Sequence, residues 1–343
     1  MNYIKKVTIH KLFGELDIEW HLDPKVNILI GKNGSGKSTL LHLIKNCLMS
    51  SQDVFLSPNI IDAMKIELAE NKYIYASKDS EALSQLQAAD KRHPHAPSKP
   101  PMNEVYRVES NIFPAENRFS DVINLCYINT FEISLENFVS ESNKAQDGVD
   151  TELDVVLAHL INDWKSYLLT LKNLETEVTV SFDEKIRELS SKASADANDL
   201  QELKTLLNEK TDKIDDINFY KNRFIEQINA LFSDSNKRLD IDKNNAIIFR
   251  NNHDKSFAVY ELSSGEKQML IILLNVLLQE NQPSIFLMDE PEISLHLAWQ
   301  LDLIDIIQSL NDNCQLIIVT HAAGVFNKGW KDKITKMENI TTQ

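Results

Sequence analysis

The residues whose types and spacing point most directly to chemistry begin at Gly31, where the chain reads GKNGSGKST. This spacing fits G-x-x-x-x-G-K-[ST], with an apolar strand-like run before it and a helical leucine pattern after it. Glycines let backbone N–H groups curl around phosphate oxygens, and a helix start adds the positive end of its dipole. A chance glycine-rich turn is the alternative. We predict a phosphate-binding loop made of Gly31, Asn33, Gly34, Ser35, Gly36, Lys37, Ser38 and Thr39.

An acidic pair follows a second apolar run, in the segment SIFLMDEPE. The run predicts a buried strand of the parallel-sheet type, which ends at Asp289 and Glu290. Lys37 would reach the terminal phosphates of a nucleotide, and Ser38 would offer its hydroxyl to Mg²⁺. Asp289 would hold the same ion through its water shell, and Glu290 would polarise the attacking water. A solvated acidic turn is the alternative interpretation of this pair.

A third apolar run, CQLIIVTH, ends in His321. In an open α/β sheet, ligands bind at the carboxyl ends of the strands, and this is where His321 is expected to lie. A neutral histidine beside Asp289 would be able to donate a hydrogen bond to a terminal phosphate oxygen. A structural histidine with no ligand is the alternative.

Two serines precede a long apolar helix pattern in ELSSGEKQML. Ser263 and Gly265 would lie at the start of this helix, where free N–H groups and the dipole favour an anion. The alternative is a capped helix without a ligand, with Ser263 or Ser264 as the cap. Both interpretations use the same N–H groups, so capping is expected in either case.

The set formed by the glycine loop, LSSGE, FLMDEPE and VTH resembles the head of an ABC-type ATPase. In that family the signature segment of one subunit closes on the nucleotide of another. The resemblance implies ATP and Mg²⁺ as cofactors, and a homodimer or higher homo-oligomer with composite ATP sites. Ser263 and Gly265 would then contact ATP held by Lys37 of the other copy. The resemblance also implies that Glu290 is the general base and His321 the switch histidine.

The sequence departs from the family pattern at three places. The signature has Ser264 where glycine is usual, and His296 stands where the aspartate of the D-loop is expected. The strand VINLCYINTF offers Asn129 and Thr130 where a Q-loop glutamine would be expected. EPEISLHLAWQ resembles the branch that contains the OLD, RecF and SMC-like ATPases more than it resembles transporter ATPases.

Some 225 residues separate the two phosphate-binding segments, and part of them has a helical heptad pattern. The predicted seams are Leu153, Leu157, Leu160, Trp164, Tyr167, Leu171, Leu174 and Val178, then Leu203, Leu207, Ile214, Ile217, Phe224, Ile228 and Leu231. They indicate a coiled-coil-like hairpin, with SSKASADAND as the turn. Two ordinary core helices are the alternative. In KRHPHAPSKPPMNE, we interpret His93 and His95 as part of an exposed proline-rich loop rather than a metal pair.

The composition is that of a soluble globular protein, with 43% hydrophobic and 25% charged residues. No apolar run approaches the ~18–20 residues needed to cross a bilayer, and no signal peptide is evident. The three cysteines are far apart in the sequence, which favours reduced thiols in the cytoplasm. A net charge of −15 argues against DNA binding by bulk attraction, although residues 1–45 contain seven lysines against four acids.

The expected fold is α/β: an ABC-type P-loop ATPase head with a mostly parallel core sheet, an antiparallel β subdomain and an inserted helical hairpin. We predict an N-terminal ATPase lobe over residues 1–150, the hairpin over 151–235, and a C-terminal lobe over 236–343. The chain ends 22 residues after His321, and we find no nuclease motif, so the output is expected to come from a partner.

Our preferred hypothesis is an ATPase subunit that gates a separate effector in bacterial anti-phage defence, and we expect this effector to be a nuclease. The chain resembles ATPase subunits of Septu-like, retron-linked and PARIS-like systems in its size and in the segments KLFGELDIEW and EPEISLHLAWQ. The first alternative is a RecF- or SMC-like repair ATPase that clamps DNA. A transporter motor is a further alternative, which the helical insertion disfavours. A non-hydrolysing scaffold is another, which the presence of Lys37, Asp289 and Glu290 disfavours. No membrane partner is expected.

Overall fold

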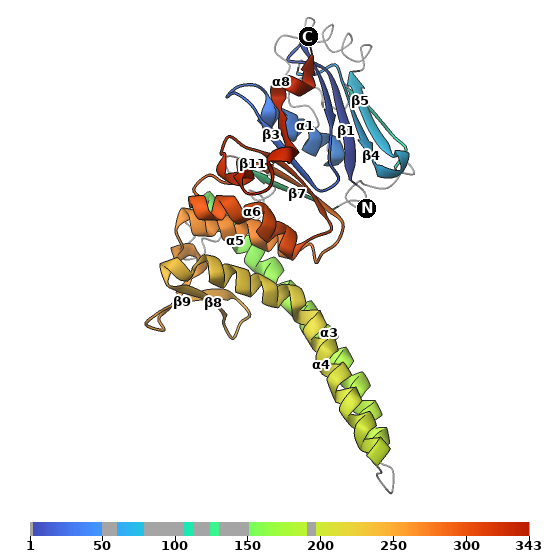
Figure 1. Ribbon diagram of the computed structural model, residues 1–343, viewed down its shortest axis with the longest axis vertical. Helices are drawn as coiled ribbons and strands as arrows, with labels where there is room; N and C mark the ends of the chain where they lie inside the picture. The colour runs from blue at the N-terminus through green and yellow to red at the C-terminus, as the bar shows by residue number, and fades with distance from the viewer. Residues whose placement is uncertain are drawn as a thin grey trace, which may run out of the picture. The chain divides into compact units, whose positions relative to one another are not determined.

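The computed structural model describes residues 3–49, 60–78, 106–112, 124–129, 151–190 and 197–342. The chain forms two compact units (Figure 1). The first contains residues 1–133 and 281–343, and the second contains residues 134–280. The predicted domain boundaries at residues 150 and 235 stay predictions.

A five-stranded, all-parallel sheet forms the centre of the first unit, in the order β13-β3-β12-β11-β7. Its strands are β3 (Val26–Ile30), β7 (Asn124–Asn129), β11 (Ser284–Asp289), β12 (Cys314–Val319) and β13 (Ile334–Lys336). Every residue of β11 and β12 is buried, which is why the sequence of each strand is mostly apolar and does not alternate between apolar and polar residues. Because the strands are parallel, β3, β7, β11 and β12 end at one edge of the sheet.

The first unit also contains a six-stranded antiparallel sheet in the order β14-β2-β1-β4-β5-β6. Its strands are β1 (Ile4–Leu12), β2 (Leu16–His21), β4 (Ala63–Leu68), β5 (Tyr73–Lys78), β6 (Tyr106–Ser110) and β14 (Thr341–Thr342). Side chains from this sheet, such as Val7 and Trp20, share one core with Leu287 and Ile317 of the parallel sheet.

The helices of the first unit are α1 (Lys37–Met49), α6 (Leu297–Leu310), α7 (Gly324–Asn327) and α8 (Met337–Ile340). The α1 helix is buried on more than one face, because Leu40, Leu41, Leu43 and Ile44 all belong to the core that the two sheets share. Burial on several sides fixes the first residue of α1 against the edge of the parallel sheet. Short 3₁₀ turns complete the chain at Ala69–Asn71, Ser233–Ser235, Val259–Glu261 and Lys331–Lys333.

The second unit is built from two long helices, a small sheet and one buried helix. The long helices are α3 (Glu152–Ser190) and α4 (Ala197–Leu231), which pack side by side as the predicted helical hairpin (Figure 1). The sheet has the order β10-β9-β8, formed by β8 (Lys237–Ile241), β9 (Ile247–Asn251) and β10 (Ser256–Ala258). The last helix, α5 (Ser264–Leu277), begins at the LSSGE segment.

Near one end of the helix pair the predicted seam residues are buried, whereas further along some of them are exposed. Trp164 is fully buried and its ring lies 5.6 Å from that of Phe224. Leu174 and Leu207, which were predicted to lie in the seam, are 42% and 47% exposed. The buried face instead passes through Asn218, whose side-chain amide donates to the carboxylate of Glu175. Whether the pair is a true coiled coil stays a prediction.

Candidate functional site

The glycine loop joins the end of β3 to the start of α1. Gly34 and Gly36 have φ values of 76° and 91°, a region that side chains strongly disfavour. A Cβ at Gly31 would come within 2.9 Å of the Met337 Cβ, so a side chain is excluded there as well. The Lys37 ammonium lies 3.1 Å from the carbonyl oxygens of both Gly31 and Lys32, inside the curve of the loop.

Asp289 lies beside the start of α1, at the carboxyl end of β11. The Ser38 hydroxyl donates a 3.1 Å hydrogen bond to the Asp289 carboxylate. Burial raises the pKa of Asp289, and the negative charge of Glu290 adds to that effect. One hydroxyl and one buried carboxylate are hard oxygen donors, so the pair fits Mg²⁺ that takes its remaining ligands from phosphate and water. Among the described residues no group of three His, Cys, Asp or Glu side chains converges as a complete protein cage.

Glu290 and His321 face each other across the ends of β11 and β12. The His321 backbone N–H donates to Glu290 Oε2 over 3.1 Å, and the His321 Nε2 lies 3.4 Å from Glu290 Oε1. The Glu290 N–H donates in turn to Val319 O at 2.8 Å. Glu290 has a φ of 47°, an unusual value for a residue with a side chain. Such a conformation persists when surrounding contacts hold it, and it aims the carboxylate back over the sheet edge.

Lys37 connects this pair to the glycine loop. Its ammonium lies 2.8 Å from Nε2 of His321. Because an ammonium only donates, this contact requires a neutral imidazole whose Nε2 accepts. Burial lowers the pKa of Lys37, while the carboxylates of Glu290 and Asp289 oppose that shift. The structure therefore brings together five of the predicted site residues: Lys37, Ser38, Asp289, Glu290 and His321.

Ser263 and Gly265 lie in the second unit, not in the first. Ser263 is the N-cap of α5, because its side chain accepts from the Glu266 N–H. Glu266 completes a capping box and also accepts from Lys237 at 2.6 Å and from Ser235 at 2.8 Å. Burial alone would raise the pKa of Glu266, but these hydrogen bonds together lower it. Ser263 itself is exposed, so the cap presents its surface to solvent.

The residues at the atypical family positions have structural roles. His296 is the N-cap of α6, with its Nδ1 accepting from the Ala298 N–H at 3.4 Å. This is a role that aspartate also performs well. Asn129 is buried at the end of β7, directly opposite Asp289 in the strand register. Thr130 lies outside the described residues, as do His93 and His95.

Phe13 is a candidate that the sequence did not reveal. It lies in the turn between β1 and β2, with a φ of 56° and an exposed fraction of 50%. Its ring edge approaches Gly36 so closely that a Cβ there would lie 3.0 Å from Phe13 Cε2. The available signal was an apolar aromatic in the turn KLFG, which is otherwise typical of a surface hairpin. Its proximity to the glycine loop depends on how the two sheets pack.

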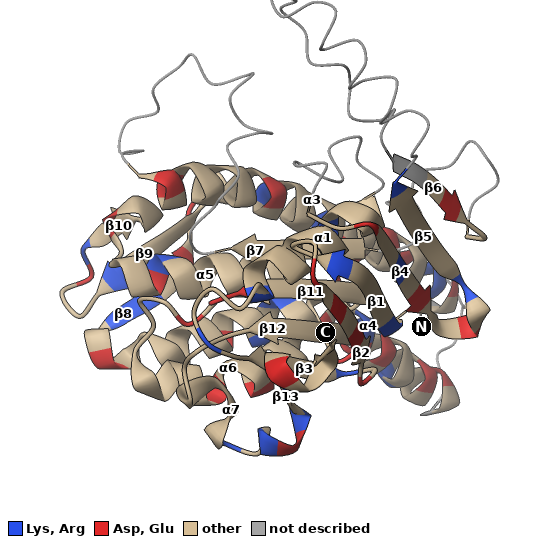
Figure 2. Ribbon diagram, turned by 90° about the horizontal axis from the view of Figure 1, so that it is seen from above, with Lys and Arg blue, Asp and Glu red and all other residues tan. Residues whose placement is uncertain are grey.

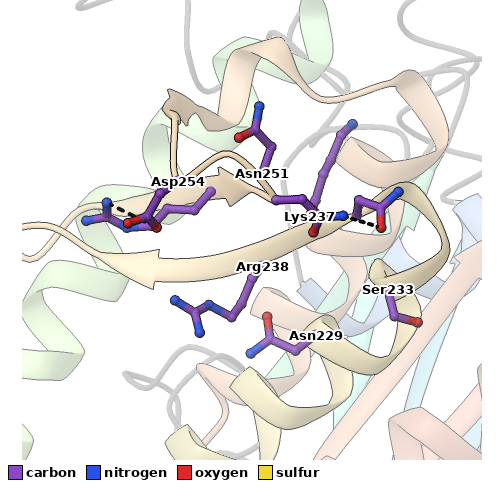
Figure 3. Close-up of a pocket in the computed structure, with 9 residues that line it drawn as sticks. Asn229, Ser233, Lys237, Arg238, Asn251 and Asp254 are labelled. Atoms are coloured by element: carbon purple, nitrogen blue, oxygen red, sulfur yellow. Dashed lines mark hydrogen bonds and ion pairs between the residues drawn. The ribbon is translucent and has the colours of Figure 1, made fainter.

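A separate polar pocket of about 420 Å³ lies in the second unit (Figure 3). Its lining comes from the end of α4 and from the β8–β9 strands, and includes Lys237, Arg238 and Arg250. Lys237 pairs with Glu266, and Arg250 pairs with Asp240 at 2.5 Å. None of the predicted site residues lines this pocket. With two of its three cations already paired, it is a weaker anion site than the glycine loop.

Charges elsewhere in the described chain are mixed. Figure 2 shows basic and acidic segments interspersed along the helices and strands. No helix among the described residues is both long enough and apolar enough to span a membrane.

The sequence matches the family described as AAA ATPase domain over residues 3–325. No curated protein matches it. Among solved structures it is similar to an SMC head bound to the C-terminal winged-helix domain of ScpA, with 14% identity and a TM-score of 0.52 over 95% of this chain and 91% of that one.

Two further SMC heads have lower scores. One, from Pyrococcus furiosus, carries an extended coiled coil and is bound to the C-terminal domain of ScpA. It has 15% identity and a TM-score of 0.49 over 98% of this chain and 96% of that one. The other, from Thermotoga maritima, has 15% identity and a TM-score of 0.44 over 95% and 91%. The fold expected from the sequence, an ATPase head with a helical insertion, is confirmed.

Proposed function

Because this chain belongs to the AAA ATPase domain family, we propose that it binds ATP with Mg²⁺ and hydrolyses it at the edge of the parallel sheet. The observation that carries the proposal is the convergence of five side chains from three separate segments. Contacts of 2.8–3.4 Å join Lys37 to His321, Ser38 to Asp289 and Glu290 to His321. In this proposal the loop residues Gly31, Asn33, Gly34, Ser35, Gly36 and Thr39 cradle the phosphates with Lys37 and Ser38.

The remaining roles follow from charge and position. Lys37 neutralises terminal phosphate charge, and Ser38 and Asp289 hold Mg²⁺, which supplies further charge neutralisation when bound. Glu290 takes the proton of the attacking water, since its carboxylate lies at the edge of the sheet beside His321. His321 orients Glu290 through its backbone N–H and offers its ring to a phosphate oxygen. Phe13, exposed beside Gly36, offers a flat apolar surface on which a nucleobase can stack.

ATP hydrolysis is tested with Lys37→Ala and the matched control Lys32→Ala. Lys32 lies in the same loop, but its ammonium is exposed and lies 3.8 Å from Glu338. We expect Lys37→Ala to lower kcat/KM by roughly 10³-fold, whereas Lys32→Ala stays within about threefold of the unmodified protein. Phosphate release measured with Mg²⁺ and ATP is the readout. Wild-type turnover by Lys37→Ala would refute the proposed site.

The proposed active assembly is a homodimer or higher homo-oligomer in which each nucleotide lies between two copies. Ser263 and Gly265 of one copy would supply N–H and hydroxyl donors to a phosphate held by Lys37 of the other. The support is chemical: both residues lie at the start of a 14-residue helix, where Ser263 is exposed and the dipole favours an anion.

The biological output we propose is the gating of a separate effector, a nuclease, in anti-phage defence in the cytoplasm. This rests on the resemblance of EPEISLHLAWQ and KLFGELDIEW to ATPase subunits of such systems. The similar SMC head is bound to a domain of another protein, which supports the idea that a head of this fold docks a partner.

The gating proposal is tested in cells that carry the gene with its neighbours. Co-purification with a neighbouring gene product is expected, together with loss of phage protection in Lys37→Ala and retention in Lys32→Ala. Full protection by Lys37→Ala would contradict the defence role even if the protein hydrolyses ATP. ATP-stimulated, strongly salt-dependent binding of duplex DNA without a protein partner would favour the DNA clamp instead.

A further inference from the structure

Glu292 is a buried carboxyl that the proposed mechanism does not use. It is 4% exposed and lies in the turn after β11. Its Oε1 accepts from the buried hydroxyl of Thr320 and from the Ala322 N–H at 3.3 Å. Its Oε2 is also buried, and among the described residues no N–H or hydroxyl group donates to it. A buried carboxylate oxygen without a donor costs free energy, so the group needs another partner.

That partner is the carboxyl of Glu290. Glu290 lies close enough to Glu292 to raise the pKa of its carboxyl, and since Oε1 of Glu292 is occupied, Oε2 is the oxygen available for a hydrogen bond between the two groups. A hydrogen bond between two carboxyl groups requires one proton, because two carboxylates only accept. Ionising both would place two negative charges in contact in a site with little water.

The proton belongs on Glu292. Burial raises its pKa to about 7, and the hydrogen bond and charge of Glu290 contribute to the rise. The Glu290 side chain is 14% exposed and receives the His321 N–H, so its charge is the better solvated of the two. The other charged or titratable groups around the pair are His321 after β12, Lys37 at the start of α1 and Asp289 at the end of β11.

We propose that Glu292 is a positioning residue, which donates its proton to one oxygen of Glu290 and holds that carboxylate toward the sheet edge. The inference rests on the proposed function, in which Glu290 is the base. During the reaction Glu292 keeps its own proton. The proton removed from water goes to Glu290, whose orientation is fixed by Glu292 on one side and by the His321 N–H on the other.

Two variants separate positioning from simple packing. Glu292→Gln keeps the shape and an N–H donor but cannot ionise, whereas Glu292→Leu removes the donor. At pH 6.5 we expect Glu292→Gln to retain kcat within about threefold and Glu292→Leu to lose roughly tenfold or more, both with little change in KM. The unmodified protein should lose kcat as the pH rises through about 7, while Glu292→Gln should not show this loss.

An infrared measurement tests the proton without using activity. The carbonyl stretch of a protonated carboxyl should be present at pH 6, should fade as the pH rises through about 7, and should be missing in Glu292→Gln. Absence of that band, an unchanged pH profile in Glu292→Gln, or unchanged kcat in Glu292→Leu would overturn the inference.

These outcomes are distinct from failure of the proposed function. If the unmodified protein hydrolyses ATP and Glu290→Gln does not, the function stands whatever the Glu292 variants do. If Glu292→Leu does not fold, the pH profile and infrared band of Glu292→Gln still decide.

Discussion

The hydroxyl of Ser263 has a structural role in addition to its proposed role at the phosphate. It accepts from the N–H of Glu266 and so caps the first turn of α5. Ser263→Ala should therefore lower the free energy of unfolding by about 0.5–2 kcal/mol, as other lost caps do. Urea denaturation measures this. Ser264→Ala, next to it and exposed, is the control and should change stability little; equal losses in both variants would show that Ser263 is not the cap that matters.

Glu266 adds a pH dependence to the same capping box. Its folded pKa is lowered below the ordinary value of 4.5, so the ionised form favours the folded state. This contribution is fully present above pH 4.5 and is lost as the pH falls through the folded pKa. Between pH 6 and 3.5, Glu266→Gln should thus lose less stability on acidification than the unmodified protein. Glu226→Gln, an exposed change on α4, should keep the original slope; identical slopes in all three proteins would contradict the role of Glu266.

At the residue scale, sequence spacing was informative only where the backbone itself sets the geometry. Lys37 and Ser38 follow the glycines directly, and Asp289 ends a buried strand, so local order places them at the sheet edge. Phe13 and Glu292 were missed for the opposite reason. Their significance depends on a neighbour far away in the chain, Gly36 for the first and Thr320 for the second, and no local pattern encodes those contacts.

At the scale of elements, strands that are buried on both faces could be predicted from the sequence, but the pairing of one strand with another could not. The strands β11 and β12 are buried on both faces, and each contains an apolar run of four residues, IFLM in β11 and LIIV in β12. The pairing of β1 with β4 joins residues about 60 positions apart, and several registers would satisfy their alternating pattern equally. In the hairpin, the heptad rule failed at Leu174 because a polar contact between Glu175 and Asn218 occupies the buried face.

The elements of the second unit are joined by a buried ion pair. Lys267 in the first turns of α5 lies 2.7 Å from Asp154 in the first turn of α3, with side chains 10% and 2% exposed. Removing one partner leaves an unpaired buried charge, so Asp154→Ala should cost about 3–5 kcal/mol in unfolding free energy. Asp163→Ala, at an exposed position of α3, should cost far less.

A second experiment isolates the charge from the packing at this contact. The double change Asp154→Leu with Lys267→Met replaces the pair with apolar groups, and should recover most of the lost stability. A double variant as unstable as Asp154→Ala would show that the loss comes from packing and not from the uncompensated charge. Because Lys267 follows Glu266 directly, the same contact fixes the start of α5, where Ser263 lies.

At the scale of the whole molecule, the two segments proposed to bind phosphate belong to different compact units. The proposed dimer uses Lys37 from one copy and Ser263 from the other, and this makes a prediction that no single-copy mechanism shares. Lys37→Ala removes the first half-site, and Ser263→Asp adds a carboxylate to the second. Asp caps helices about as well as Ser, but it also replaces the hydroxyl that donates to Glu266 at 2.8 Å, so circular dichroism is used to check that the second variant is folded. Each variant alone should be inactive, because both of its sites lack one half.

Mixing the two variants in equal amounts restores one complete site in each mixed dimer. Random exchange makes half of the dimers mixed, and each has one of its two sites intact, so about a quarter of the unmodified ATPase rate should return. The measurement is phosphate release after the variants have exchanged subunits in the presence of ATP. A sample of Lys37→Ala alone, taken through the same exchange, is the control and should show no recovery of ATPase activity. A mixture no more active than its separate components, although light scattering shows mixed dimers, would mean that each copy builds its site alone.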